Sequence, residues 1–291
     1  GFANCLKLDC TTADTSIAAD ESLFLQHRFE GQDLQSIGKG VAGAKEITVS
    51  FYVKANAAFT FGCELYDVDN ARQITKLFNT TTGWVRHEIT FPADVDDGSS
   101  PFDDDNARSL DMNFHLHAGS NLTSGTLNTT SWANNTSANR LAGIDSFYSS
   151  TDNNFFITGV QLEVGSVATP FEHRSFGEEL ALCQRYFQKI GGTADNTPYQ
   201  VFSIVTFETS SAAWGTVPLK VTMRTKPTVV YSGTFATSVG TAGTLASDGN
   251  QAGPYNAIIG WSGGSGGTTG YSSYFRSSNN VAHFISFKSE L

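Results

Sequence analysis

Aromatic and polar side chains alternate with apolar ones in three runs of this sequence, and their chemistry suits a saccharide. Aromatic rings pack against the C–H faces of sugars, while polar groups bind the hydroxyls. If the runs are neighbouring strands of one sheet, these side chains share its solvent-facing side, because successive side chains of a strand point to opposite faces. The positions are Tyr52, Glu64, Tyr66, Asn113, His115 and His117. They are candidates for a glycan-binding face, but a subunit contact or an ordinary outer face is the favoured interpretation, because the jelly roll hosts many unrelated functions.

Two long loops, residues 93–108 and 120–139, hold the other candidates, because long loops in compact β domains often carry contacts. Trp132 in the second loop either holds a ligand or closes the end of a sandwich. Aspartates gather in and beside the first loop, at Asp94, Asp96, Asp97, Asp103, Asp104, Asp105 and Asp111. Calcium prefers such oxygen ligands, but the glycine spacing of an EF-hand is absent. We therefore expect a solvated acidic loop and no cofactor, with a structural calcium as the alternative.

Motifs for catalysis are missing from the sequence, which has no G-x-S-x-G, no H-E-x-x-H and no P-loop. Carboxylates of a glycosidase pair are recognised only by their separation in space. The residues that could form such a pair are Glu64, Asp67, Glu88 and Glu163. We expect no enzymatic activity, and a capsule polysaccharide depolymerase is the least favoured alternative.

The composition predicts a mainly β protein. The chain has 291 residues, 28 glycines and 22 phenylalanines, with 40% hydrophobic but only 16% charged residues, a balance that favours short strands joined by small-residue turns. A net charge of -10 argues against nucleic acid as a partner. No apolar run approaches the roughly 20 residues of a membrane span, so we expect no membrane insertion. We interpret Cys5, Cys10, Cys63 and Cys183 as reduced and buried, as in a protein assembled in the cytoplasm.

Strict alternation over residues 47–53 predicts a strand with one buried face. The same period recurs over residues 59–65, 85–91, 110–116 and 160–164, after two earlier segments at 6–10 and 23–29. Seven or eight strands are what a jelly roll needs. Beyond residue 192 we expect a smaller, loop-rich β domain with strands over residues 199–208, 217–223, 257–261 and 281–287.

One helix is predicted between these β regions, over residues 175–190. Ser175 and Glu178 have the spacing of a capping box, and Gly191 and Gly192 follow the last turn. One face of this helix is apolar and consists of Leu180, Cys183, Phe187 and Ile190. Such a face usually packs into its own domain. Because this helix stands alone, we instead expect the stripe to lie at a three-fold axis, buried between the copies of a homotrimer.

The segment FITGVQLEVGSVATPFEHRSFGEELALCQRYFQK, from Phe156 to Lys189, resembles one that recurs in bacteriophage tail-fibre and related virion proteins. The earlier pieces LQHRFEGQDLQ, ITVSFYVKA, GWVRHEITFP and NFHLHAGSNLTSGTLN resemble the carbohydrate-binding-module-like jelly roll of those proteins. VPLKVTMRTKPTVV and the closing ISFKSEL resemble their terminal β domain. The resemblance implies three parts: a jelly roll over residues 1–172, a linking helix over 173–192 and a C-terminal β domain over 193–291.

The resemblance also implies a function. It implies a structural protein on the virion surface, in a tail fibre or similar appendage. Such proteins are often trimeric and contact other virion proteins. Adhesion to the host surface is part of what the resemblance implies, with a host cell-surface glycan as a candidate partner. A dedicated glycan-binding receptor-recognition module is the closest alternative.

Overall fold

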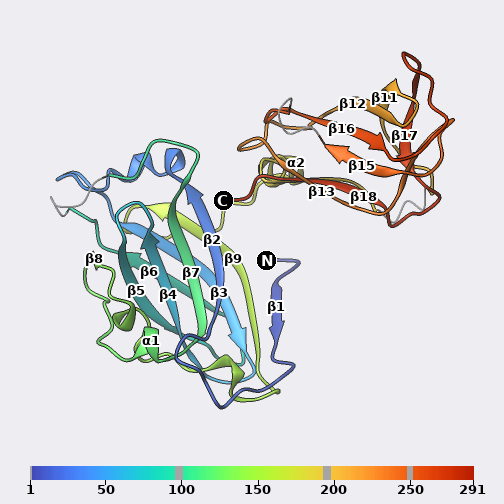
Figure 1. Ribbon diagram of the computed structural model, residues 1–291. Helices are drawn as coiled ribbons and strands as arrows, with labels where there is room; N and C mark the ends of the chain where they lie inside the picture. Colours follow the sequence, from blue (N-terminus) through green and yellow to red (C-terminus); the bar gives the residue numbers. More distant parts are fainter. Residues whose placement is uncertain (1, 96–100, 193–197, 248–251) are drawn as a thin grey trace. The chain divides into compact units, whose positions relative to one another are not determined.

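The computed structural model describes residues 2–95, 101–192, 198–247 and 252–291 (Figure 1). The chain forms two compact units, and the boundary between them along the sequence lies between His173 and Arg174. This division lies one residue from the expected end of the jelly roll. The structure is mainly β, as the composition predicts.

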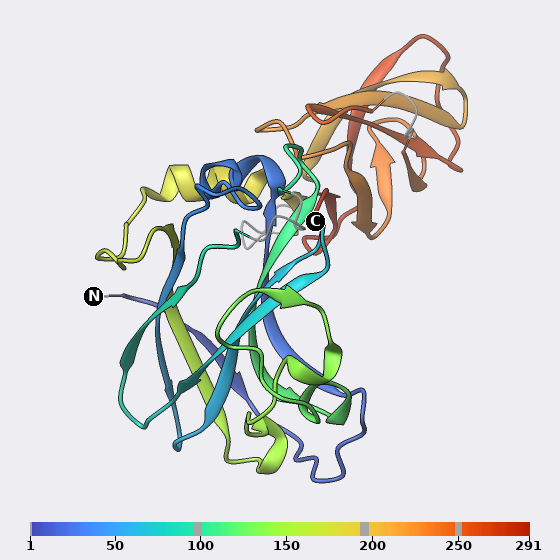
Figure 2. The same cartoon turned by 90° about the vertical axis from the view of Figure 1, so that its left-hand side faces the viewer.

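The first unit is a sandwich of two antiparallel sheets (Figure 2). The four-stranded sheet has the order β1 (Leu6–Asp9), β9 (Asn154–Val164), β3 (Ile47–Ala55) and β6 (Val85–Phe91). The five-stranded sheet has the order β2 (Ser22–Glu30), β7 (Arg108–Ala118), β4 (Thr60–Asp67), β5 (Arg72–Asn79) and β8 (Ala133–Asn134). Because the chain passes repeatedly from one sheet to the other, the connectivity is that of a jelly roll. The alternating runs predict every long strand except β5.

Alternate residues of these strands meet in one core between the two sheets. The ring of Phe51 on β3 lies 4.8 Å from the ring of Phe114 on β7 and 5.0 Å from that of Phe78 on β5, measured between centroids. Burying a phenylalanine fully stabilises the fold by roughly 1.5–3 kcal/mol. The core therefore fixes which face of each strand points outward. The short helical elements of this unit are η1 (Gly31–Asp33), η2 (Gln35–Ile37), α1 (Ser120–Thr123), η3 (Ser137–Asn139) and η4 (Phe147–Ser149).

The second unit also contains two antiparallel sheets, with orders β10-β18-β13 and β14-β17-β11-β12-β16-β15. Their strands are β10 (Phe187–Gly191), β11 (Val201–Thr209), β12 (Ala212–Pro218), β13 (Thr228–Ser232), β14 (Phe235–Thr237), β15 (Thr244–Ser247), β16 (Asn256–Ser262), β17 (Ser272–Ser277) and β18 (Phe284–Lys288). The predicted strand at 217–223 is wrong, because β12 ends at Pro218, whose nitrogen cannot donate to a ladder. The unit is richer in strands than the sequence suggests.

Helix α2 (Phe176–Gln184) begins as predicted but ends six residues before Ile190. The backbone N–H of Glu178 donates to Ser175 Oγ, and the Glu178 carboxylate accepts the backbone N–H of Ser175 at 2.9 Å, so the capping box is formed. The predicted C-terminal part is wrong, because residues 187–191 form strand β10 and pair with β18. Pairing with β18 satisfies the backbone hydrogen-bonding groups of residues 187–191. It also lets Ile190 pack against the core of the second unit.

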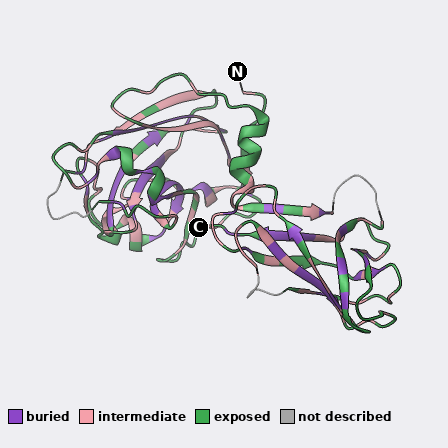
Figure 3. Cartoon of the chain, turned by 90° about the horizontal axis from the view of Figure 1, so that it is seen from above, coloured by how far each residue is buried: buried purple, intermediate pink, exposed green. Residues whose placement is uncertain are grey.

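The predicted apolar stripe is therefore not one helical face. Leu180 and Cys183 lie on α2 and are exposed, whereas Phe187 and Ile190 lie on β10. No residue of α2 is buried, and the helix is green in Figure 3. The cysteines also depart from expectation: Cys10 and Cys63 are buried, but Cys5 and Cys183 are exposed.

Candidate functional site

The residues predicted to share one glycan-binding face lie on two different sheets. Tyr52 is on β3 of the four-stranded sheet, whereas Glu64 and Tyr66 are on β4 of the five-stranded sheet. His115 and His117 are on β7, next to β4. The prediction of a single face is wrong, because it assumed that β3 and β4 are neighbours. They belong to opposite layers of the sandwich, whose outer surfaces point away from each other.

The outer surface of the five-stranded sheet is covered by residues 119–149. Arg140 donates from Nε and Nη2 to the carboxylate of Glu64 at 2.6 and 2.7 Å, and its guanidinium lies 5.0 Å from the centre of the Tyr66 ring. Ser146 Oγ lies 2.8 Å from His117 Nδ1. As a result Glu64, His115 and His117 are only 0, 2 and 1% exposed. These predicted ligand-binding residues are buried beneath the chain's own loop.

Glu64 anchors this covering loop as a buried carboxylate. Burial alone would raise its pKa, but hydrogen bonds from Arg140 and His115 outweigh burial and lower the pKa to about 2. Asn113 Nδ2 donates a further hydrogen bond at 3.0 Å. An ionised, fully engaged carboxylate cannot protonate a glycosidic oxygen, so Glu64 is unsuited to be the acid of a glycosidase pair.

The aspartates and Trp132 near the other end of this unit are structural. Asp67 pairs with Lys39 at 2.6 Å, and Asp94 pairs with Arg72 at 2.8 Å and with Lys39 at 3.5 Å. Asp94 is buried, so the expectation of a solvated cluster is wrong at this position. Trp132 is also buried, and its Nε1 donates to the Pro92 carbonyl at 2.9 Å. Trp132 therefore closes the end of the sandwich.

The remaining aspartates of the predicted cluster differ among themselves. Asp111 is buried and accepts hydrogen bonds from Gln26 and Arg108. Asp103, Asp104 and Asp105 are exposed, as expected. Asp96 and Asp97 lie outside the described residues. Among the residues that the structure describes, no group of three His, Cys, Asp or Glu side chains is arranged to hold a metal ion.

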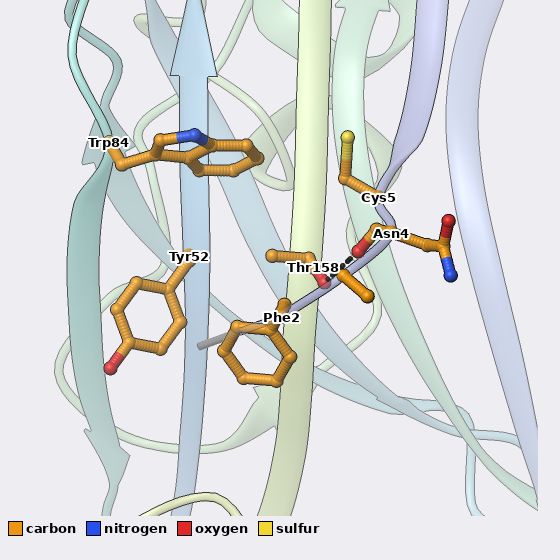
Figure 4. A pocket seen from close by; sticks show the side chains of 7 residues that line it. Phe2, Asn4, Cys5, Tyr52, Trp84 and Thr158 are labelled. Atoms are coloured by element: carbon orange, nitrogen blue, oxygen red, sulfur yellow. Dashed lines mark hydrogen bonds between the residues drawn. The ribbon is translucent and has the colours of Figure 1, made fainter.

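The outer surface of the four-stranded sheet carries an open aromatic hollow (Figure 4). Its volume is about 250 Å³. The rings of Tyr52, Trp84 and Phe2 face it from β3, from the residue before β6 and from the N-terminal arm, which we define as residues 2–5. The Phe2 and Tyr52 rings lie 5.4 Å apart, and Trp84 is 45% exposed. Polar walls complete the hollow, which is lined by Phe2, Ala3, Asn4, Cys5, Tyr52, Trp84 and Thr158.

A bulge in β9 shapes the floor of this hollow. Ser50 pairs with Gln161 but Tyr52 pairs with Thr158, so β9 has one extra residue at this point. Gly159 in the bulge has a φ of 59°, a left-handed conformation that favours glycine. The Phe2 ring packs directly over Gly159, where a side chain would collide with it. Glycine at this position therefore makes room for one aromatic wall.

Three further contacts hold the N-terminal arm in place. Thr158 Oγ1 donates to the backbone carbonyl of Asn4 at 2.9 Å, a bond drawn in Figure 4. The rings of Phe171 and His173 lie 4.9 and 5.5 Å from the ring of Phe2. The aromatic wall is thus supported by the segment that follows β9, and the hollow needs parts of the chain more than 150 residues apart in sequence.

Basic residues stand beside the aromatic rings of the hollow. Lys54 Nζ lies 4.5 Å from the centre of the Phe156 ring and 5.3 Å from that of Trp84. The Arg86 guanidinium lies 5.9 Å from the centre of the Tyr52 ring, pairs with Glu88 and donates to the Thr169 carbonyl at 2.6 Å. Cation–π contacts of this kind position a basic side chain while leaving its charge exposed to a ligand.

Sequence reasoning found Tyr52 but missed the other walls of the hollow. Trp84 carried a usable signal, because it precedes the alternating strand at 85–91 and has the same parity as Arg86 and Glu88, which point outward. Phe2 carried none, since its role depends on the N-terminal arm reaching Gly159. Comparison with models of known protein families gives no match, and comparison with curated proteins gives none. Among the described residues, no helix has the length and apolar character to cross a membrane.

Proposed function

We propose that this chain is a non-enzymatic, adhesive component of a phage virion appendage, and that the aromatic hollow binds a saccharide of the host surface. The hollow is the observation that carries the adhesive part of this proposal. It combines the exposed ring of Trp84 and the partly exposed rings of Tyr52 and Phe2 with polar groups at the outer surface of the four-stranded sheet, which is the surface chemistry that sugars require. The resemblance of Phe156–Lys189 to tail-fibre sequences supports placing the chain on the virion surface.

The polar atoms at the hollow support a sugar ligand. Within the described residues, the Tyr52 hydroxyl, the Trp84 indole N–H and the Asn4 side-chain amide have no hydrogen-bond partner in the protein. These groups offer both donors and acceptors beside the rings. A sugar stacked on Trp84 or Tyr52 would therefore find partners for its hydroxyls without displacing any protein hydrogen bond.

The test is binding of the full chain to host-surface polysaccharides, measured on an array and then by calorimetry. Trp84→Ala should abolish or strongly weaken binding, because it removes the most exposed aromatic wall of the hollow. Tyr271→Ala is the matched control, since Tyr271 is an aromatic residue 68% exposed in the second unit. Binding that survives Trp84→Ala, or no binding to any host polysaccharide, would contradict the proposed site.

The alternative of a depolymerase is separated by its products. A binding module leaves the polysaccharide intact, whereas a hydrolase releases reducing ends. Glu64 and Asp67 support the non-enzymatic proposal, because both are fully buried in ion pairs within the jelly roll. Release of reducing ends by the purified chain would overturn it.

We further propose that the chain assembles as a homotrimer through α2 and contacts other virion proteins. Helix α2 has nine residues and none is buried. Its apolar side chains are exposed as well: Leu180 is 42% and Leu182 is 48% exposed. A helix this short is marginal in water without apolar partners, and neighbouring copies would supply them. Light scattering should show a trimer for the wild type and smaller species for Leu180→Asp, with Glu179→Gln as the control. Antibody labelling of imaged particles tests the virion location.

A further inference from the structure

We infer that the hollow selects saccharides that carry a carboxylate, and that Lys54 is the residue that recognises it. This inference rests on the proposed function, since it names the class of sugar that the hollow takes. The observation behind it is a positioned basic side chain at the edge of the hollow. Within the described residues, Lys54 forms no ion pair with any carboxylate.

Two other basic side chains near the hollow, Lys7 and Arg86, are already paired with carboxylates. Lys7, whose ammonium lies 5.6 Å from the centre of the same Phe156 ring, pairs with Asp9 at 2.8 Å. Arg86 pairs with Glu88 on β6. Of these three side chains, Lys54 is thus the one whose charge, among the described residues, lacks an acidic partner.

The ring contacts hold the Lys54 ammonium where a bound sugar can reach it. Lys54 pairs with Phe156 in the β3–β9 register, and Tyr52 pairs with Thr158 two residues away on the same face. These two rows of the sheet are about 7 Å apart, the rise of two residues along a strand. Trp84 connects the hollow with Lys54, because it lines the hollow and its ring also contacts the Lys54 ammonium. A sugar stacked on the hollow would place its own substituents, or those of the next unit, beside the ammonium.

The net negative charge of the chain opposes the attraction of an acidic saccharide to Lys54. At -10 it repels an acidic polysaccharide at a distance. Near physiological salt the screening length is about 8 Å, so this repulsion is largely screened, while a direct contact with Lys54 is screened less. Selection for a carboxylate therefore has to come from a local group, and it should be measured at that salt concentration.

The experiment compares oligosaccharides that contain glucuronic acid with the same oligosaccharides after reduction of the carboxyl group. We expect the wild-type chain to bind the acidic forms roughly two- to fivefold more tightly, the range of a partly exposed ion pair. Lys54→Met should remove this preference, so that the variant binds the acidic and the reduced forms with equal affinity. Lys54→Arg should retain it, because the positive charge remains.

A second measurement locates the bound sugar. Cys5 lines the hollow and is exposed, so a saturating acidic oligosaccharide should slow its alkylation by iodoacetamide. Cys183 is exposed in the second unit and serves as an internal reference whose rate should not change. Protection of Cys183 as well as Cys5 would indicate an effect outside the hollow and would contradict the inference.

The outcomes separate the inference from the function on which it rests. If neither form binds, both the adhesive function and the inference fail. If both forms bind equally and protect Cys5, the hollow is a saccharide site but the selection for a carboxylate is wrong. If the preference for the acidic form survives Lys54→Met, another residue recognises the carboxylate and the assignment to Lys54 is overturned.

Discussion

The two outer surfaces of the jelly roll carry similar residues but differ in solvent exposure. The five-stranded sheet presents Glu64, Tyr66 and His115 beneath the segment 119–149, whereas the four-stranded sheet presents Tyr52 and Trp84 to solvent. On the first surface, Arg140 occupies the position that a ligand would need. On the second, the rings keep open space beside them. Residue type and strand parity therefore do not define a binding surface unless it is also known which segment covers the sheet.

The largest expected effect comes from removing the residue that holds the cover in place. Arg140→Met leaves the buried carboxylate of Glu64 without its main partner, and we expect a loss of about 3–5 kcal/mol in the free energy of unfolding. Hydrogen exchange of peptides from β4 and β7 reports on this unit within the full chain. The control is Lys7→Met, whose ion pair with Asp9 is about half exposed and should contribute at most about 1 kcal/mol. Equal effects of the two substitutions would mean that the cover does not depend on Glu64.

A related effect should appear as a pH dependence of stability. The pKa of Glu64 is lowered from 4.5 to about 2 on folding, against the opposing effect of burial, by hydrogen bonds from Arg140 and His115. A lowered folded pKa means that the stabilisation is complete above about pH 4.5 and is lost as the pH falls toward 2, an amount of about 3 kcal/mol.

The matched variant for this pH effect is Glu64→Gln, which has no charge to lose. Hydrogen exchange of β4 and β7 between pH 5 and 2 should show a steeper loss of protection in the wild type than in the variant. If the two proteins lose protection in parallel, other groups control the acid response.

Substitution of one tyrosine on each outer surface tests which of the two surfaces binds a saccharide. Tyr52→Ala should weaken saccharide binding roughly tenfold, equal to about 1.4 kcal/mol, because it removes a wall of the open hollow. Tyr66→Ala should leave the affinity unchanged, since Arg140 lies over its ring. Calorimetry with the same polysaccharide measures both. A loss of affinity in the Tyr66 variant alone would show that ligands bind the covered sheet.

The sequence predicts the strands better than it predicts the site, and the residues show why. Alternation is a local property, so it correctly points Tyr52, Glu64 and His115 away from the core. Whether such a side chain reaches solvent depends on distant segments, such as Arg140 over β4 or Phe2 over Gly159. None of these contacts has a local pattern.

The two ends of helix α2 also differ in whether they depend on local or distant residues. The start of α2 depends on Ser175 and Glu178, which are three residues apart, and the capping box is formed. Its end depends on the pairing of β10 with β18, about 100 residues further along the chain. Local signals therefore predict where this helix begins but not where it stops.

The smallest expected effect is that of metal chelation, which should leave the thermal midpoint of the chain unchanged. The buried aspartates already have cationic partners: the Lys39 ammonium lies between Asp67 and Asp94, and Arg72 binds Asp94 from Nε and Nη2. A calcium ion at this position would have to displace a buried ammonium at considerable cost. Thermal unfolding in EDTA and in added calcium should therefore coincide.

Lys39→Met is the matched variant, because it removes the ammonium from between two carboxylates and should lower the midpoint in either buffer. A calcium-dependent rise in the wild-type midpoint would show that other aspartates, outside this pair, bind the metal.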